Sequence, residues 1–244
     1  MIKLSRLLSN SPIPITQDIV FSQPKLDEIV DMGEELYWTL IKIWAVDRQD
    51  LIEEETEELK KLDDFEVWKR CIFSSPDLQQ RLLWSIDCLL KQKVEFMPMS
   101  GTILIGENDS SVMVDNTFYL TMRDIAKSIM VYSGFGSDND SQYKETKNMS
   151  AREREMIRKM KANAEKIDRI KNGNRKTEDQ LIKRIVSLVA IGHYTFDQVY
   201  EMTMLQLIFL LKKYSDIEQY ELHVALSPYI DSKKNEPVKH WLET

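Results

Sequence analysis

The sequence predicts a mainly α protein, built as a multi-helix bundle with a small β hairpin or meander near residues 94–114. Three observations predict this fold class. The 244 residues include only seven Gly and seven Pro, too few for the many turns of a β-sandwich or propeller. Apolar residues recur at three- and four-residue spacing over most of the chain, as in helices with one buried face. Short β-prone runs separated by turn residues cluster around residues 94–114.

The N-terminal region is expected to start extended and to continue as a helix. Prolines disfavour a helix at residues 12–14, and Ile-Val-Phe at 19–21 favours a strand, so residues 13–21 should form a strand or extended arm. A helical apolar face then runs from Leu26 to Trp44. Apolar residues also lie off that face, which indicates burial on two sides. These residues are Met32, Leu36, Trp38 and Ile43.

Capping signals predict three more helices before the β region. Small polar residues precede three apolar runs at helical spacing, as N-caps do. The caps are Asp47, either Asp63 or Asp64, and Ser75, which Pro76 follows at the first helical position. The predicted helices cover 47–62, 63–72 and 75–90. Three β-prone pieces at 94–96, 102–105 and 112–114 then predict the hairpin or meander.

The C-terminal half is expected to be helical after a break. A helix should run from Thr121 to near Gly134, and the polar, aperiodic residues 134–150 predict a flexible linker or loop. Further helices are expected over 151–171, 178–191, 196–202 and 204–226. The predicted organisation is an α-rich domain at 1–133 with the small β element, the linker at 134–150 and a helical domain at 151–244. A single domain is the alternative.

The charges reverse along the chain. Residues 27–66 contain 15 Asp/Glu against 4 Lys/Arg, whereas residues 152–176 contain 10 Lys/Arg against 4 Asp/Glu. This layout suits a protein that binds another macromolecule or associates with itself. The overall charge of −7 disfavours general nucleic-acid binding. With two cysteines, no CxxC pair and no long apolar segment, the sequence also predicts a reduced, non-secreted protein without a membrane span.

No motif in the sequence predicts catalysis, a cofactor or a metal site. The three histidines, at 193, 223 and 240, lack ligand spacing. The stretch GFGSDND at 134–140 lacks the GK[ST] of a phosphate loop and the glycine of a calcium loop. The acidic run at 53–59 is expected to be a solvated helix face. The basic run at 152–176 is expected to be a charged amphipathic helix, with RNA binding as the alternative.

Four stretches of the sequence resemble one group of viral proteins. They are PIPITQDIVFSQPKLDEIVDMGEELYWTLIKI, TFYLTMRDIAKSIM, VYEMTMLQLIFLLKKYSDIEQYELHVAL and the closing HWLE. In their order and pattern they resemble tail assembly chaperones and related tail-morphogenesis proteins of tailed bacteriophages of Gram-positive hosts. The resemblance implies a non-enzymatic protein of the host cytoplasm, without cofactor, that binds and shields apolar helices of the tape-measure protein or another tail protein.

A shielding protein of this kind needs an apolar groove with a charged rim. The chain contains twelve methionines, whose adaptable side chains suit such a surface, although an ordinary core is the alternative. The candidate partner-binding residues lie in two helices: Met32, Leu36, Trp38 and Ile43 in the first, and Met202, Met204, Leu207 and Leu211 at the second.

Two other functions stay open from the sequence. A structural virion subunit of the tail or connector would use the same helices as permanent interfaces. A regulatory nucleic-acid-binding protein would use residues 152–176.

Overall fold

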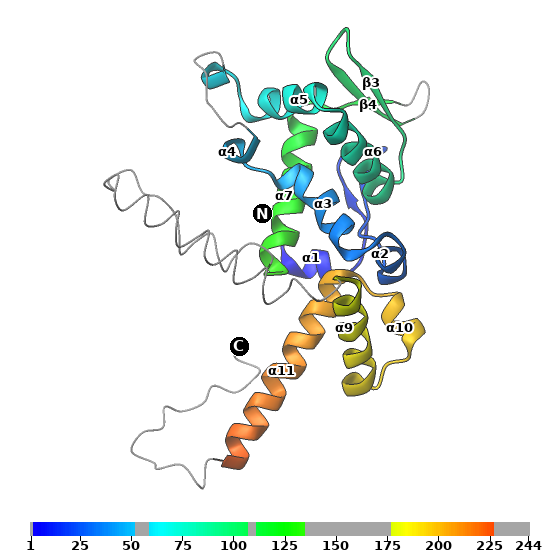
Figure 1. Cartoon of the computed structure of the whole chain (residues 1–244), viewed down its shortest axis with the longest axis vertical. Helices are drawn as coiled ribbons and strands as arrows, with labels where there is room; N and C mark the ends of the chain where they lie inside the picture. The colour runs from blue at the N-terminus through cyan, green and yellow to red at the C-terminus, as the bar shows by residue number, and fades with distance from the viewer. Residues whose placement is uncertain (1, 52–58, 107–110, 135–176, 227–244) are drawn as a thin grey trace, which may run out of the picture.

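The structure is a computed structural model that describes residues 2–51, 59–106, 111–134 and 177–226. Helices hold 68% of the described residues, and the same ranges contain two small antiparallel sheets, of two and three strands. The predicted fold class, mainly α with a small β element, is therefore confirmed. Figure 1 shows α9, α10 and α11 at the opposite end of the molecule from strands β3 and β4.

Four helices form the centre of the bundle. Helix α3 (Glu34–Ala45) packs against both α6 (Pro76–Leu90) and α7 (Asn116–Tyr132), and α5 (Asp64–Ser74) covers α6 and α7. The rings of Trp44 and Trp68 stack with their centroids 5.2 Å apart. Both indole N–H groups are satisfied in the core, since Trp44 donates to Ser85 Oγ at 2.8 Å and Trp68 to the carbonyl of Ile43 at 2.9 Å. The aromatic cluster thus buries a large apolar area without leaving these donors unpaired.

The helix predicted from Leu26 to Trp44 is two helices. Helix α2 (Leu26–Met32) ends at Gly33, and α3 begins at the next residue. Gly33 has φ of +91° and ψ of 137°, a conformation that residues with a Cβ avoid. Its N–H donates to the carbonyl of Ile29, and its carbonyl accepts from the N–H of Tyr37. One glycine therefore closes the first helix, opens the second and changes their direction, which apolar periodicity does not reveal.

Several predicted caps are confirmed. Asp63 accepts a hydrogen bond from the N–H of Glu66, and Ser75 accepts one from Leu78, with Pro76 at the first position of α6. The predicted start of α7 at Thr121 is wrong. Asp115 caps this helix by accepting from Phe118, and Thr121 lies within it.

The β elements occur where the sequence predicts them. Strands β1 (Ile13–Pro14) and β2 (Val20–Phe21) pair with each other near the N-terminus. Strands β3 (Val94–Met97), β4 (Thr102–Ile105) and β5 (Val112–Met113) form an antiparallel meander. Alternate β4 residues, Ile103 and Ile105, are buried. One face of this small sheet therefore packs on the core.

The predicted helix over 47–62 lies partly outside the described residues. Helix α4 (Arg48–Leu51) begins where expected, and residues 59–61 form a short 3-10 helix, η1 (Leu59–Lys61). The carboxylate of Asp47 binds α7 by accepting from Lys127 at 2.6 Å and from Arg123 at 3.1 Å. A further helix, α1 (Leu4–Leu8), has only five residues, which is too short for a periodic pattern to predict it.

The three C-terminal helices pack against the N-terminal region. They are α9 (Thr177–Gly192), α10 (Phe196–Tyr200) and α11 (Met204–Leu226), in agreement with the predicted helices at 178–191, 196–202 and 204–226. The N–H of Leu26 donates to the carbonyl of Met202 at 2.8 Å, and Gln206 donates to the carbonyl of Leu8 at 2.8 Å. One cluster of buried residues includes members from Leu7 to Leu207. Residues 135–150 of the predicted linker and the predicted helix at 151–171 lie outside the described residues, and the division into domains stays a prediction.

Candidate functional site

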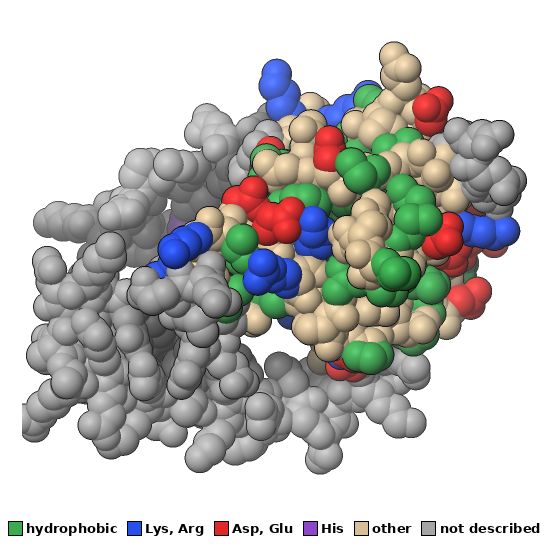
Figure 2. Space-filling view, turned by 90° about the horizontal axis from the view of Figure 1, so that it is seen from above, with side chains coloured by type: hydrophobic (Ala, Val, Ile, Leu, Met, Phe, Trp, Pro, Cys, Tyr) green, Lys and Arg blue, Asp and Glu red, His purple; other side chains and the backbone are tan. Residues whose placement is uncertain are grey.

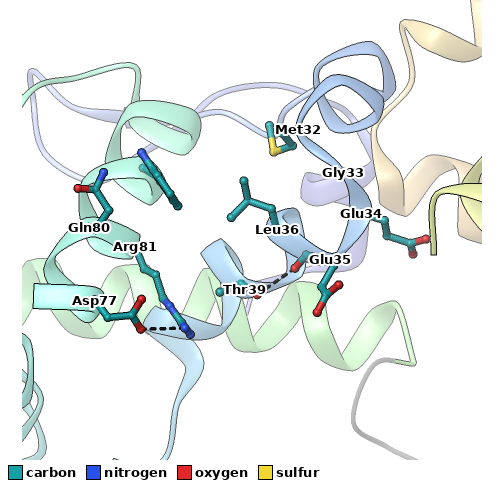
Figure 3. Close-up of a pocket in the computed structure, with 10 residues that line it drawn as sticks. Met32, Gly33, Glu34, Glu35, Leu36, Thr39, Asp77, Gln80 and Arg81 are labelled. Atoms are coloured by element: carbon teal, nitrogen blue, oxygen red, sulfur yellow. Dashed lines mark hydrogen bonds and ion pairs between the residues drawn. The ribbon is translucent and has the colours of Figure 1, made fainter. Parts of the chain in front are cut away.

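A surface groove lies between α3 and α6, beside the end of α2. It encloses about 570 Å³ and is lined by Met32, Gly33, Glu34, Glu35, Leu36, Thr39, Asp77, Gln80, Arg81 and Trp84. Figure 3 shows the two walls, with Met32 and Leu36 on one side and Asp77, Gln80 and Arg81 of α6 on the other. The groove is thus formed by the first turns of α3 and the first half of α6.

Helices α3 and α6 pack against each other through their buried faces, and the neighbouring, partly exposed faces of the two helices form the groove walls. Tyr37, Leu40 and Trp44 of α3 are buried, whereas Leu36 lies half-buried on the next face. The Ser85 hydroxyl of α6 donates to the carbonyl of Leu40 at 2.9 Å. This buried bond holds the two helices together beneath the groove, so its apolar walls are supported by the core.

The groove has an apolar part that the fold leaves open. Trp84 is 45% exposed, and Met32 and Leu36 are half-buried on the facing wall. An exposed tryptophan beside other apolar side chains is typical of a protein–protein contact, where tryptophan is enriched and serves as an anchor. This part of the groove therefore suits an apolar side chain of a partner.

Four charged residues border this apolar part. Glu34 is 7% exposed, and its Oε1 accepts from Arg184 of α9 at 2.8 Å and from the indole of Trp38 at 3.2 Å. On the other wall, Arg81 binds Asp77 at 2.8 Å, one turn away on α6. Glu35 is exposed at the edge. Glu34, Asp77 and Arg81 thus have partners within the chain, whereas the Glu35 carboxylate faces solvent.

The lining side chains offer binding groups and lack an activated nucleophile. The one hydroxyl among them, that of Thr39, donates to the backbone carbonyl of Glu35 at 2.9 Å. Elsewhere in the described part of the chain, burial raises the pKa of the Cys88 thiol to about 11, so this sulfur is protonated at neutral pH. Within the same ranges, no group of three or more His, Cys, Asp or Glu side chains could hold a metal ion. Nor is any helix long and apolar enough to cross a membrane among the residues that are described.

The structure separates the predicted partner-binding residues into surface and core. Met32 and Leu36 line the groove, whereas Trp38 and Ile43 are buried at 5% and 7% exposure. At the second helix, Met204 and Leu207 are fully buried, and Met202 and Leu211 are half-buried against the core. In the described part of the chain these four residues belong to the core, and their role in partner binding stays a prediction. Their neighbours in the same chain account for their apolar character.

Sequence reasoning missed the whole α6 wall of the groove. The buried stripe of α6 includes Leu82, Ile86 and Leu89, and Trp84 falls midway between two of these positions, on the opposite side of the helix. A large aromatic residue outside the buried stripe of α6 is the sequence signal that could have indicated an exposed binding surface on this helix. Which helix lies across from it could not be inferred from α6 alone.

Exposed methionines gather on the small sheet, away from the groove. Met97 and Met113 lie on the outward face of β3 and β5, and Met99 is fully exposed in the turn after β3. Figure 2 views the molecule from this end and shows hydrophobic side chains at the surface among polar and charged ones. The methionines therefore divide between core, as for Met122 and Met204, and surface. No cavity accompanies the methionines of the sheet among the pockets with described linings.

Other sequence features are placed only in part. His193 follows α9 with φ of +56°, as expected for a residue in a helix-ending turn, and His223 lies on α11. Several of these features lie outside the described residues: positions 53–58 of the acidic run, the stretch at 135–140, the basic run at 152–176 and His240.

Comparisons with protein-family models, with curated proteins and with solved structures found no match to this chain. The groove geometry and the sequence resemblance are therefore the two grounds for a functional proposal.

Proposed function

We propose that this chain is a non-enzymatic phage tail assembly chaperone that binds an amphipathic helix of a partner protein in the α3–α6 groove. The proposed partner is the tape-measure protein or another tail protein, and the proposed place of action is the host cytoplasm. The observation that carries the binding mode is the exposed Trp84, which lines the same groove of about 570 Å³ as Met32 and Leu36. The sequence resemblance supports the choice of partner.

The shape and composition of the groove favour a helix as the bound element. An amphipathic helix presents apolar side chains one turn apart, and such side chains insert into apolar grooves as anchors. Trp84 and Leu36 supply apolar surface, while Gln80, Asp77 and Arg81 supply polar groups along the edge. This combination of an apolar centre and a polar rim is the usual anatomy of a reversible protein interface. A client helix would be shielded from solvent while bound and could leave during assembly.

Co-expression tests the proposal directly. The full chain is expressed with a fragment of the tape-measure protein encoded in the same phage, and the mixture is separated by size exclusion. We expect a soluble complex with wild-type protein. Trp84→Ala removes the largest exposed apolar side chain of the groove and should weaken the complex at least about tenfold, in the range for a central aromatic anchor.

A matched variant separates the groove from general surface hydrophobicity. Phe196 of α10 is 48% exposed and lies outside the groove, so Phe196→Ala should leave the complex intact. Failure of the wild-type chain to associate with the fragment overturns the proposal. Mass spectrometry of purified virions decides between the chaperone and a structural tail or connector subunit, because a chaperone leaves the particle and a structural subunit stays.

A further inference from the structure

We infer that the groove selects a basic amphipathic helix, with an apolar side chain against Met32 and Leu36 and with Lys or Arg side chains that reach the exposed Trp84 ring and the exposed Glu35 carboxylate. This inference deepens the proposed function and rests on it. It adds the chemical class of the partner, which the apolar surface alone does not specify.

The charges that line the groove are mainly acidic. Three carboxylates, those of Glu34, Glu35 and Asp77, lie along it with a single cation, Arg81. The Arg81 guanidinium is held by Asp77 at 2.8 Å, and the Glu34 carboxylate is held by Arg184 at 2.8 Å. After these two pairs, the Glu35 carboxylate is left as an exposed negative charge on the groove wall.

The partial positive charges of two helix N-termini at the groove offset its negative charge only in part. The N-termini of α3 and α6 both lie there, because Glu34 and Asp77 occupy their first turns. Each N-terminus carries the equivalent of about half a positive charge. With Glu34 paired to Arg184, the Glu35 carboxylate still carries a full negative charge against the half charge of the α3 N-terminus, so this wall of the groove stays acidic. A helix with acidic flanks would meet repulsion there, and one with basic flanks would meet attraction.

Trp84 supplies the second element that a basic side chain needs. Its indole is 45% exposed and lines the same groove as Glu35. The face of an indole ring attracts a Lys ammonium or Arg guanidinium, and tryptophan does so better than the other aromatic residues. The aliphatic stem of Lys or Arg can also cover apolar surface while its charged end stays at the solvent-exposed rim, where Glu35 is exposed. Met32 and Leu36 then take the apolar neighbour of that basic residue.

The surrounding sequence has the same sign. Residues 27–45, which cover nearly all of α2 and all of α3, have five Asp/Glu against one Lys/Arg. Charge of one sign around a groove attracts oppositely charged partners over about one Debye length, roughly 8–10 Å at physiological salt. The choice of a basic partner therefore agrees with both the local and the regional charge.

Two synthetic helical peptides of 18 residues test the inference. Both have the same leucine stripe, and their flanking positions are Lys in one and Glu in the other. Calorimetric titration into the full-length chain at low salt should give about tenfold tighter binding of the Lys peptide, from one exposed ion pair and one cation–π contact. The preference should fall when salt is raised, because salt screens exposed charges.

Three variants assign the preference to the named groups. Glu35→Gln should reduce the Lys-over-Glu ratio about threefold, as expected for one exposed ion pair. Glu218→Gln makes the same charge change on the exposed surface of α11 and should leave the ratio unchanged. Trp84→Leu keeps an apolar side chain but removes the ring, so it should lower the affinity for the Lys peptide more than that for the Glu peptide.

The outcomes separate this inference from the proposed function. Equal binding of both peptides, abolished by Trp84→Ala, overturns the basic preference and leaves the helix-binding groove in place. Tighter binding of the Glu peptide overturns the preference in the same way. Binding of neither peptide overturns this inference, and the co-expression with the tail fragment then decides the proposed function separately.

Discussion

The Glu34 carboxylate of α3 accepts a hydrogen bond from the Arg184 guanidinium of α9 at 2.8 Å, across 150 positions of sequence. The same Glu34 oxygen accepts from the indole of Trp38. Because Glu34 also lines the groove, this ion pair joins the wall of the proposed binding site to the C-terminal helices. The placement of α9 therefore contributes to the position of the groove residues.

We expect Arg184→Ala to destabilise the chain by about 1–2 kcal/mol. Removal of the cation leaves a nearly buried carboxylate with only the Trp38 donor, and unpaired buried charges are costly. The Arg184 side chain is partly exposed, so the loss should be below the 3–5 kcal/mol seen for fully buried pairs. Urea unfolding gives the free energy of unfolding. In the Glu34→Gln background, Arg184→Ala should lower the free energy of unfolding by less. An equal loss in both backgrounds would contradict a stabilising Glu34–Arg184 ion pair.

Ser85→Ala should cost about 1–3 kcal/mol, because the indole N–H of Trp44 then lies in the core without its acceptor. In the structure Ser85 Oγ accepts from Trp44 at 2.8 Å and donates to the carbonyl of Leu40. Ser74→Ala is the control, since exposed Ser74 donates only to the local carbonyl of Cys71. Chemical denaturation of both variants is the measurement. A cost for Ser85→Ala no larger than for Ser74→Ala would show that the buried bond contributes little.

Gly33→Ala should destabilise the chain by about 1–3 kcal/mol through backbone strain alone. A Cβ at this position would meet no atom within 4 Å, but the φ of +91° is unfavourable for any residue with a side chain. Thermal and urea unfolding give the loss. Gly101 has φ of +61°, which asparagine tolerates, so Gly101→Asn should cost less than Gly33→Asn. The reverse order would exclude strain at Gly33 as the cause.

The stability of the fold should decrease in acid partly through Asp47. The hydrogen bond from Lys127 is the main cause that holds the pKa of Asp47 below its ordinary value, and Arg123 adds to it. A carboxylate with a lowered folded-state pKa stabilises the fold above its unfolded-state pKa of about 4, and that stability is lost as the pH falls through the lower folded-state value. In Asp47→Asn, the free energy of unfolding should therefore depend less on pH below about 5. Asp18→Asn makes the same substitution at an exposed aspartate in the turn before β2 and serves as the control for the loss of one carboxylate.

Local features of the sequence were enough to predict most helices and strands. The caps at Asp63 and Ser75 depend on bonds to residues three positions later, and the meander depends on short β-prone runs between turns. Errors arose where two local signals competed. The predicted helix start at Thr121 is wrong because Asp115, just after β5, already caps the helix. Gly33 looks like one small residue in an apolar stripe, and only its backbone conformation shows that the helix divides there.

The sequence by itself determined the mainly α class, the site of the β meander and the apolar character of Met32 and Leu36, because these depend on composition and on spacing within one element. Only the tertiary structure decided that Trp38, Ile43, Met204 and Leu207 are core, that Trp84 and Leu36 line one groove, and that Arg184 reaches Glu34. The physical reason is that periodicity identifies which face of a helix is apolar, whereas the choice of the helix that covers it depends on packing between residues far apart in the chain.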